Sequence, residues 1–410
     1  MRVLISGSSI AGPACAFWLH QAGAEVTVVE KARAPRPGGH AVDVRGVARR
    51  IVEAMGVREA IRARQVDERG IALVDRNNRP FGKLPATAFG GEGMIAEIEI
   101  ARGDLAEVLR EATEDVADYR YGDRITALAQ DPTGVDVTFA SGTTGRYDVV
   151  LGADGVHSGV RALAFGPETD YVRHLGAYSA YFTVADPGDL DHWALMYNEP
   201  GRVALLRPER GGTAKAGLSF RESSPGFARL TRDEELRLVA ERMAGAGWKI
   251  PGLLAQMPDA PDFFFDAISQ VRVPRWWRGR VALVGDAGYC GSPLAGLGTS
   301  LSLTGAYVLA GELATRPDPE SAFAAYQDVM ADYVASGLEL PPGGMSGFAP
   351  NSRLMIRARG LSFGMISRWP MRQLVAKQFG KADAITLKDY ALGATRLPDR
   401  AVTPGTPARR

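Results

Sequence analysis

The first thirty residues of the chain constrain its fold more than any other stretch. Residues 2–6 (RVLIS) predict a buried strand, residues 13–21 a helix, and residues 25–30 (EVTVVE) a second strand. Two strands joined through a helix in such a short unit run parallel, because a parallel pair needs a crossover connection. The chain therefore begins as an α/β fold with a parallel sheet.

The turn between the first strand and the helix has the form of a dinucleotide-binding loop. It follows the pattern G-x-G-x-x-G, with Gly7 and Gly12 in place and Ser9 at the middle glycine. Gly7 permits a tight turn, Gly12 lets helix and strand approach closely, and the helix N-terminus offers unpaired N–H groups to a pyrophosphate. Glu30 ends the second strand, where a carboxylate accepts hydrogen bonds from ribose hydroxyls and disfavours a 2′-phosphate. The loop alone also fits a βα turn without a ligand, and it does not separate FAD from NAD. The candidate cofactor residues beside it are Ile10, Ala11 and Lys31.

Two later segments also lead from an apolar strand into a glycine-rich acidic loop. Residues 150–161 read VLGADGVHSGVR, and residues 280–298 read RVALVGDAGYCGSPLAGLG. Asp154 and Asp286 thus follow strands directly, at the sheet edge where α/β folds bind their ligands. The alternative is that both carboxylates merely cap strand ends.

The three motifs, in this order and spacing over roughly residues 1–340, resemble the class A FAD-dependent monooxygenases of the para-hydroxybenzoate hydroxylase fold. Within that family, the chain resembles the branch of actinobacterial aromatic polyketide hydroxylases and tetracycline-inactivating monooxygenases. The resemblance implies an α/β fold: a Rossmann-like FAD-binding domain, an inserted, mostly antiparallel β-sheet substrate domain, and a C-terminal helical segment.

The resemblance also assigns cofactor contacts. Asp286 would hold the ribityl chain of the flavin, and Arg102, in the sequence ARGDL, resembles an R-x-x-L element that touches the flavin linker. Arg45 and Pro293 resemble residues near the isoalloxazine, and Asp154 one that serves both FAD and the passing nicotinamide nucleotide. The remaining implied cofactor residues are Gly155, Arg161, Gly285, Gly296, Leu297 and Gly298.

The chemistry implied by the resemblance is centred on the flavin. NADPH or NADH would reduce FAD, and dioxygen would form a flavin C(4a)-hydroperoxide that hydroxylates an aromatic or polycyclic small molecule. No second G-x-G-x-x-G follows a later strand, so we expect the nicotinamide nucleotide to bind transiently. Tyr289 stands where many family members have histidine, so no role of that histidine is transferred to this chain. No protein residue is identified as a general base.

The substrate pocket is expected against residues 170–270, where strand patterns and aromatic residues are dense. Along a strand only alternate side chains face one side of the sheet, so the period of two decides which of them reach the pocket. The alternative for each is packing within the sheet or exposure to solvent. By resemblance to the tetracycline-inactivating branch, the strands that carry Trp193, Arg207 and Lys215 would line the pocket. Tyr181 and Phe220 are the other substrate candidates.

Composition excludes several other classes of function. Lys plus Arg number 48 and Asp plus Glu 47, a balance that argues against general nucleic-acid binding. Two cysteines, Cys15 and Cys290, and no signal peptide favour the cytoplasm. The five histidines lack metal-ligand spacing, so we expect no metal. Residues 287–311 carry no charge, but their glycines and Pro293 predict a loop and a buried helix rather than a membrane span.

The domain organisation follows from these assignments, with residues 46–64 and 318–337 predicted as single helices. Residues 340–382 carry seven basic and no acidic residues, which fits either a helical cover with solvated arginines or an amphipathic element for a membrane or partner. We expect a monomer or a homodimer. The predicted parts are 1–75, 101–168 and 273–340 for FAD binding, 76–100 and 169–272 for substrate, 341–396 as a helical cover, and 397–410 as a flexible tail.

Other functions on the same fold remain open at this stage. A flavin-dependent epoxidase has the same cofactor motifs. A halogenase would be expected to carry W-x-W-x-I-P, of which residues 246–251 (AGWKIP) have only the second half. A non-catalytic flavin-binding redox protein would bind FAD without turnover.

Overall fold

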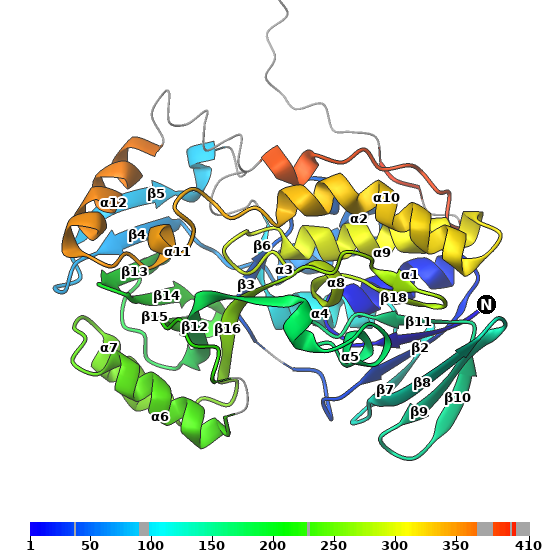
Figure 1. The fold of residues 1–410 in the computed structure, drawn as a ribbon. Coiled ribbons are helices and arrows are strands. Elements are labelled where there is room, and N and C mark those ends of the chain that lie inside the picture. The colour runs from blue at the N-terminus through cyan, green and yellow to red at the C-terminus, as the bar shows by residue number, and fades with distance from the viewer. Residues whose placement is uncertain (37, 90–97, 228–229, 367–379, 394–395, 399–410) are drawn as a thin grey trace, which may run out of the picture.

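The computed structural model describes all residues except 37, 90–97, 228–229, 367–379, 394–395 and 399–410. Two large sheets lie in the two halves of the molecule, and the short strands β3 (Ala41–Asp43) and β6 (Glu99–Ala101) lie between them (Figure 1). The predicted flexible tail falls almost entirely outside the described residues.

The first sheet confirms the parallel arrangement expected from the N-terminal unit. Its order is β17-β18-β11-β1-β2-β7, and every neighbouring pair is parallel except β17 with β18. The helix α1 (Ala11–Gln21) connects β1 to β2 as predicted. The strands are Arg2–Ser6 (β1), Glu25–Glu30 (β2), Ala117–Tyr121 (β7), Val149–Gly152 (β11), Trp277–Arg278 (β17) and Val281–Leu283 (β18).

Helices cover this sheet and bury its core. The uncharged stretch from 287 forms a short helix, α8 (Asp286–Tyr289), then a loop and the buried helix α9 (Gly298–Thr315), as predicted. Helix α10 (Pro319–Gly337) begins where expected, because the Asp318 side chain accepts a hydrogen bond from the backbone N–H of Ser321. Within the described part of the chain, no helix is long and apolar enough to cross a membrane.

The predicted single helix over residues 46–64 is wrong. The chain forms α2 (Val47–Ala54) and α3 (Arg58–Ala63), separated at Gly56, whose φ of 73° ends the first helix. The other helices of this half are α4 (Arg102–Glu111) and α5 (Gly159–Ala164). A three-stranded sheet of β8 (Ile125–Asp131), β9 (Gly134–Phe139) and β10 (Thr144–Tyr147) extends from it.

The second large sheet has seven strands and confirms the mostly antiparallel insert. Its order is β16-β12-β15-β14-β13-β4-β5, and only β13 with β4 is parallel. Strand β4 lies within the range 1–75 that we assign to FAD binding, yet it pairs with β13, so hydrogen bonding places this segment in the second sheet. The rest of the domain division stays a prediction. The strands are Gly70–Val74 (β4), Pro80–Pro85 (β5), Val172–Val184 (β12), Trp193–Glu199 (β13), Arg202–Pro208 (β14), Ala214–Arg221 (β15) and Phe264–Val271 (β16).

The two faces of this sheet carry different partners. Ala180, Phe182 and Ala216 lie in an apolar core that α6 (Arg232–Met243) and α7 (Ile250–Gln256) cover from the outer side (Figure 1). Part of the opposite face looks toward the FAD-binding half, and part of it, with Leu73 and Met196, forms a second apolar core. Alternate residues of each strand therefore belong either to the α6 and α7 core or to this opposite face.

The C-terminal part of the described chain covers both halves. Helices α11 (Gly344–Phe348) and α12 (Arg353–Ile366) pack on the second sheet, where Arg359 donates to the backbone oxygen of Phe348 at 3.0 Å rather than lying in solvent. Residues 380–392, which we call the C-terminal strap, return to α9 and α10. There the Tyr390 hydroxyl donates to Glu312 of α9 at 2.7 Å, and the Tyr333 hydroxyl donates to the backbone oxygen of Ala382 at 3.1 Å.

Candidate functional site

The glycine turn after β1 has the geometry of a phosphate-binding loop. Gly7 has a φ of 108° and its N–H donates to Val29 of β2 at 2.8 Å. A Cβ at Gly7 would collide with the backbone oxygen of Ala153, and one at Gly12 with the backbone oxygen of Gly7. Helix α1 has no side-chain cap, so its first N–H groups remain available to a phosphate. The turn therefore fits a pyrophosphate.

Ser9 and Glu30 anchor the rim of this turn. The Arg102 guanidinium donates to the Ser9 hydroxyl at 3.1 Å, so the serine at the middle position contacts the arginine expected near the cofactor. Glu30 accepts from the backbone N–H groups of Ser8 at 3.0 Å and Ala32 at 2.9 Å. Lys31, by contrast, is exposed.

The loop after β11 connects two cofactor motifs through buried polar contacts. Asp154 accepts from the backbone N–H of Val160 at 3.1 Å and from the hydroxyl of Ser158, and burial raises its pKa. Arg161 is fully buried and donates to the backbone oxygens of Ala287 at 2.9 Å and Val156 at 2.6 Å. Arg161 has no exposed surface, so the structure supports a positioning role for it between the two loops rather than direct contact with a ligand.

The loop after β18 brings a half-buried carboxylate to the same edge. Asp286 begins α8, and burial raises its pKa, while the Cys290 thiol and the Arg102 guanidinium oppose that shift. Gly296 has a φ of 69° with open space at its Cβ position, and α9 begins at Gly298 without a side-chain cap. Pro293 is exposed on the same loop. The loop therefore offers open backbone and free N–H groups, which suit a flat ring carrying polar edges.

Arg45 is tied to this loop from the opposite side. The Arg45 guanidinium pairs with Asp43 at 2.7 Å, and the Arg45 backbone oxygen accepts from the Ser300 hydroxyl of α9 at 3.1 Å. These contacts hold the Arg45 segment against the start of α9. Tyr289 places its hydroxyl 2.6 Å from that of Tyr326 inside the core. Burial raises the pKa of the Cys290 thiol, in agreement with a packing role.

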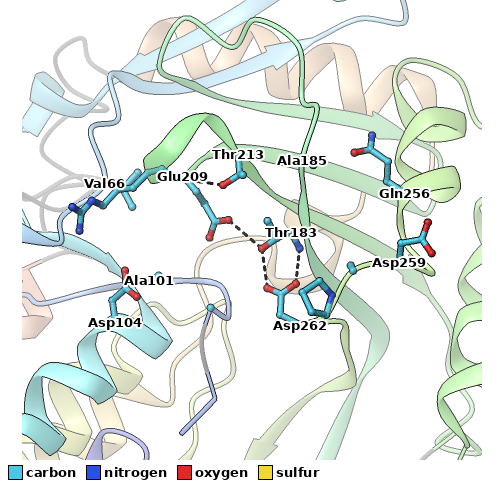
Figure 2. Close-up of a pocket in the computed structure, with 14 residues that line it drawn as sticks. Val66, Ala101, Asp104, Thr183, Ala185, Glu209, Thr213, Gln256, Asp259 and Asp262 are labelled. Carbon is cyan, nitrogen blue, oxygen red and sulfur yellow. Dashed lines mark hydrogen bonds between the residues drawn. The ribbon is translucent and has the colours of Figure 1, made fainter.

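A cavity of about 570 Å³ opens between the two halves (Figure 2). Gly38 and Ala101 form one wall, and Thr183 of β12 and Asp262 form another. Figure 2 shows Asp262 and Glu209 hydrogen-bonded to Thr183 at its centre. The other lining residues are Val66, Asp104, Ala185, Arg210, Thr213, Gln256, Asp259, Ala260 and Pro261.

Three of the five substrate candidates face this boundary. Tyr181 lies with its ring centre 5.3 Å from that of His40, on the side of the FAD-binding half. The Lys215 ammonium donates to Thr183 at 2.7 Å and pairs with Asp262 and Glu209. Arg207 of β14 also lies on this side, because its guanidinium pairs with Glu99 of β6 at 2.6 Å.

Two substrate candidates are wrong because they lie on the other face of the sheet. Phe220 is 2% exposed and stacks near Tyr178 and Phe265 in the core under α6 and α7. Trp193 also packs against that core. Trp248, from the partial halogenase pattern, lies on the same outer side, where it donates to Asn78 and stacks on Tyr197. Its side chain therefore lies away from the cavity.

Sequence reasoning missed a buried charge cluster around Arg207. The guanidinium pairs with Glu68 at 2.7 Å and with Glu99 of β6 at 2.6 Å, and both carboxylates are at least 96% buried. Burial raises the pKa of Glu99 to about 8, although Arg207 opposes the shift. Glu68 and Glu99 lie in segments without a motif, so only the long-range pairing of the two halves identifies them.

His157 links the two halves with a charge that depends on pH. Its Nδ1 lies 3.0 Å from Glu168 and its Nε2 lies 3.2 Å from Asp266 of β16. The hydrogen bond to Asp266, with both carboxylate charges, raises the pKa of His157 from 6.5 to about 9. The protonated imidazole can donate to both carboxylates at once.

We expect this bridge to make stability depend on pH. Because the folded-state pKa is raised, the stabilisation is complete below pH 6.5 and is lost as the pH rises through about 9. The melting temperature of the wild type should therefore fall more steeply over this interval than that of His157→Gln. Parallel curves for the two proteins, measured by circular dichroism, would contradict the role of this bridge.

A phosphate turn and two acidic loops at one sheet edge, facing a cavity and a separate antiparallel sheet, define a class A FAD-dependent monooxygenase. The chain belongs to the family described as "FAD binding domain", whose model matches residues 1–327. Within the described residues, no group of three or more histidine, cysteine or acidic side chains could hold a metal ion.

Individual relatives support this assignment. A protein named "Flavin-dependent monooxygenase" from an unknown prokaryotic organism is 39% identical over 340 residues, which cover 81% of this chain and 86% of the relative. An uncharacterized protein of Mycobacterium tuberculosis H37Rv is 42% identical over 351 residues, covering 85% of this chain and 94% of its own. The crystal structure of tetracycline destructase Tet(55) is 34% identical, with a TM-score of 0.79, and covers 95% of this chain and 98% of that protein.

Proposed function

We propose that the enzyme uses NADPH or NADH and dioxygen to hydroxylate an aromatic or polycyclic small molecule. The observation that carries this proposal is the cavity between the FAD-binding half and the half that holds the seven-stranded sheet. Its volume of about 570 Å³ lies within the range of small-molecule sites. The relative Tet(55), named a tetracycline destructase, supports a multi-ring substrate.

FAD, when bound, supplies the reduction of dioxygen and the transfer of one oxygen atom. The residues of the protein bind the cofactor and enclose the reaction site. The Gly7–Gly12 turn would hold the pyrophosphate, Asp286 the ribityl hydroxyls, and the N-terminus of α9 the polar edge of the ring. Asp154 would serve both FAD and the visiting nicotinamide nucleotide. The wall formed by Tyr181 and its neighbours would keep bulk water from the reacting atoms.

The remaining proposals concern context. We infer a cytoplasmic enzyme, supported by Cys15 and Cys290, which are both buried and unpaired. We propose a monomer or a homodimer. We propose that hydroxylation, rather than epoxidation or halogenation, is the main outcome.

The FAD-loaded protein should oxidise NADPH or NADH faster when an acceptable substrate is added. Tetracycline and a panel of simple phenols are suitable probes, with oxygen-18 gas to label the product. A mass increase of one labelled oxygen atom in the product, seen by mass spectrometry, is the expected result. Formation of hydrogen peroxide alone with every compound would contradict the proposal, and a halide-dependent product mass would favour a halogenase.

A further inference from the structure

The histidine that follows the Gly38-Gly39 pair faces the substrate sheet rather than the phosphate turn. The His40 ring lies 5.3 Å from the Tyr181 ring at an angle of 36° between the two planes. Its backbone oxygen accepts from the N–H of Arg102 at 3.1 Å, which fixes the segment against α4. Gly38, two residues before it, and Thr183, two residues after Tyr181, both line the cavity.

The His40 imidazole is neutral and has a free acceptor. Burial and then the charges of Arg102, Arg207 and Lys215 lower its pKa to about 4, so that one ring nitrogen carries a lone pair at neutral pH. Within the described residues, no group donates a hydrogen bond to this ring. Neither nitrogen is among the fully buried unpaired polar atoms, so the ring is not sealed inside the protein.

Four carboxylates of this boundary are already engaged. Those of Asp262 and Glu209 accept from Thr183 and pair with Lys215, and those of Glu68 and Glu99 pair with Arg207. The imidazole of His40, by contrast, has no hydrogen-bond partner among the described residues. It therefore stays available as an acceptor beside Tyr181.

We propose that His40 accepts a hydrogen bond from a hydroxyl group of the substrate, so that the enzyme selects phenols and enols over their O-methyl ethers. This inference rests on the proposed function, because it assumes that the cavity takes the substrate. His40 is thus a specificity-determining residue.

The test compares 4-nitrophenol with 4-nitroanisole, in which a methyl group replaces the donor hydrogen, at about pH 5.5, where the phenol keeps its proton and His40 stays neutral. Equilibrium dialysis against the FAD-loaded wild type should give about tenfold tighter binding of the phenol, the size expected for one hydrogen bond to a buried acceptor. His40→Leu should bring this ratio close to one by weakening the phenol alone. His40→Gln keeps a side-chain acceptor and should restore most of the ratio.

Three results would overturn the inference. They are an unchanged ratio in His40→Leu, no binding of 4-nitrophenol by the wild type, and loss of FAD from both His40 variants, which would place the ring against the cofactor. Failure of the proposed function appears differently. In that case the phenol preference and its dependence on His40 remain, but no labelled oxygen enters any product.

Discussion

The variant Asp286→Asn should purify as a folded protein that has lost most of its FAD. The wild-type carboxylate is half-buried at the N-terminus of α8, at the sheet edge where the flavin ribityl chain would lie. Hydrogen bonds to a charged acceptor contribute about 1.5–3 kcal/mol each, so FAD should bind roughly 10- to 150-fold more weakly. The ratio of flavin to protein absorbance after purification, and FAD titration of the apoprotein, measure the loss.

Stability of the apoprotein separates this effect from misfolding. Because burial raises the pKa of Asp286, the ionised carboxylate is costly in the empty site, and the amide should leave the apoprotein as stable as the wild type or more so. Asp328→Asn, at an exposed position on α10, is the matched control and should retain FAD fully. Full FAD occupancy in Asp286→Asn would show that this carboxylate does not hold the cofactor.

The variant Arg207→Met should be the most destabilising single change at the boundary between the halves. It leaves Glu68 and Glu99 buried without their shared cation, which costs about 3–5 kcal/mol in comparable buried ion pairs. We expect a clear fall in melting temperature of the apoprotein, measured by calorimetry. Because protonation removes the uncompensated charge, the loss should be smaller at pH 6 than at pH 9.

The charge-free triple variant provides the control. Arg207→Met combined with Glu68→Gln and Glu99→Gln removes the whole cluster at similar volume, so it should recover most of the stability lost in the single variant. In the wild type, the raised pKa of Glu99 makes its own contribution fall as the pH rises from about 4.5 to about 8. Equal melting temperatures for Arg207→Met and the wild type at pH 9 would contradict this account.

Local sequence signals predicted the cofactor edge well because each motif is short and continuous. The motif residues follow their strands as expected: Gly7 and Gly12 after β1, Asp154 after β11 and Asp286 after β18. The sequence also shows glycine at the two positions where the backbone leaves no room for a Cβ. The contacts to FAD that these residues imply stay predictions. Arg161 shows the limit, since its spacing marked it as part of the motif but only the packed structure shows it buried between two loops.

The substrate side was less predictable because it depends on register and on long-range contacts. Abundance of aromatic residues did not reveal which face each one occupies, and Phe220 therefore lies in the outer core while Tyr181 reaches the boundary. The partners of Arg207 come from segments more than a hundred residues away, at Glu68 and Glu99. No periodic pattern in one segment can identify such a pair.

The C-terminal strap has a practical consequence for work on the enzyme. Tyr390 holds the buried carboxylate of Glu312 on α9, the same helix whose first residue, Gly298, adjoins the cofactor loop. Shortening the polypeptide before residue 380 would uncover that helix and remove the Tyr390 hydroxyl from Glu312, which would keep only its pairing with Arg316 at 2.9 Å. C-terminal truncations would therefore change the yellow flavin colour of the purified protein, although they remove no residue beside the flavin.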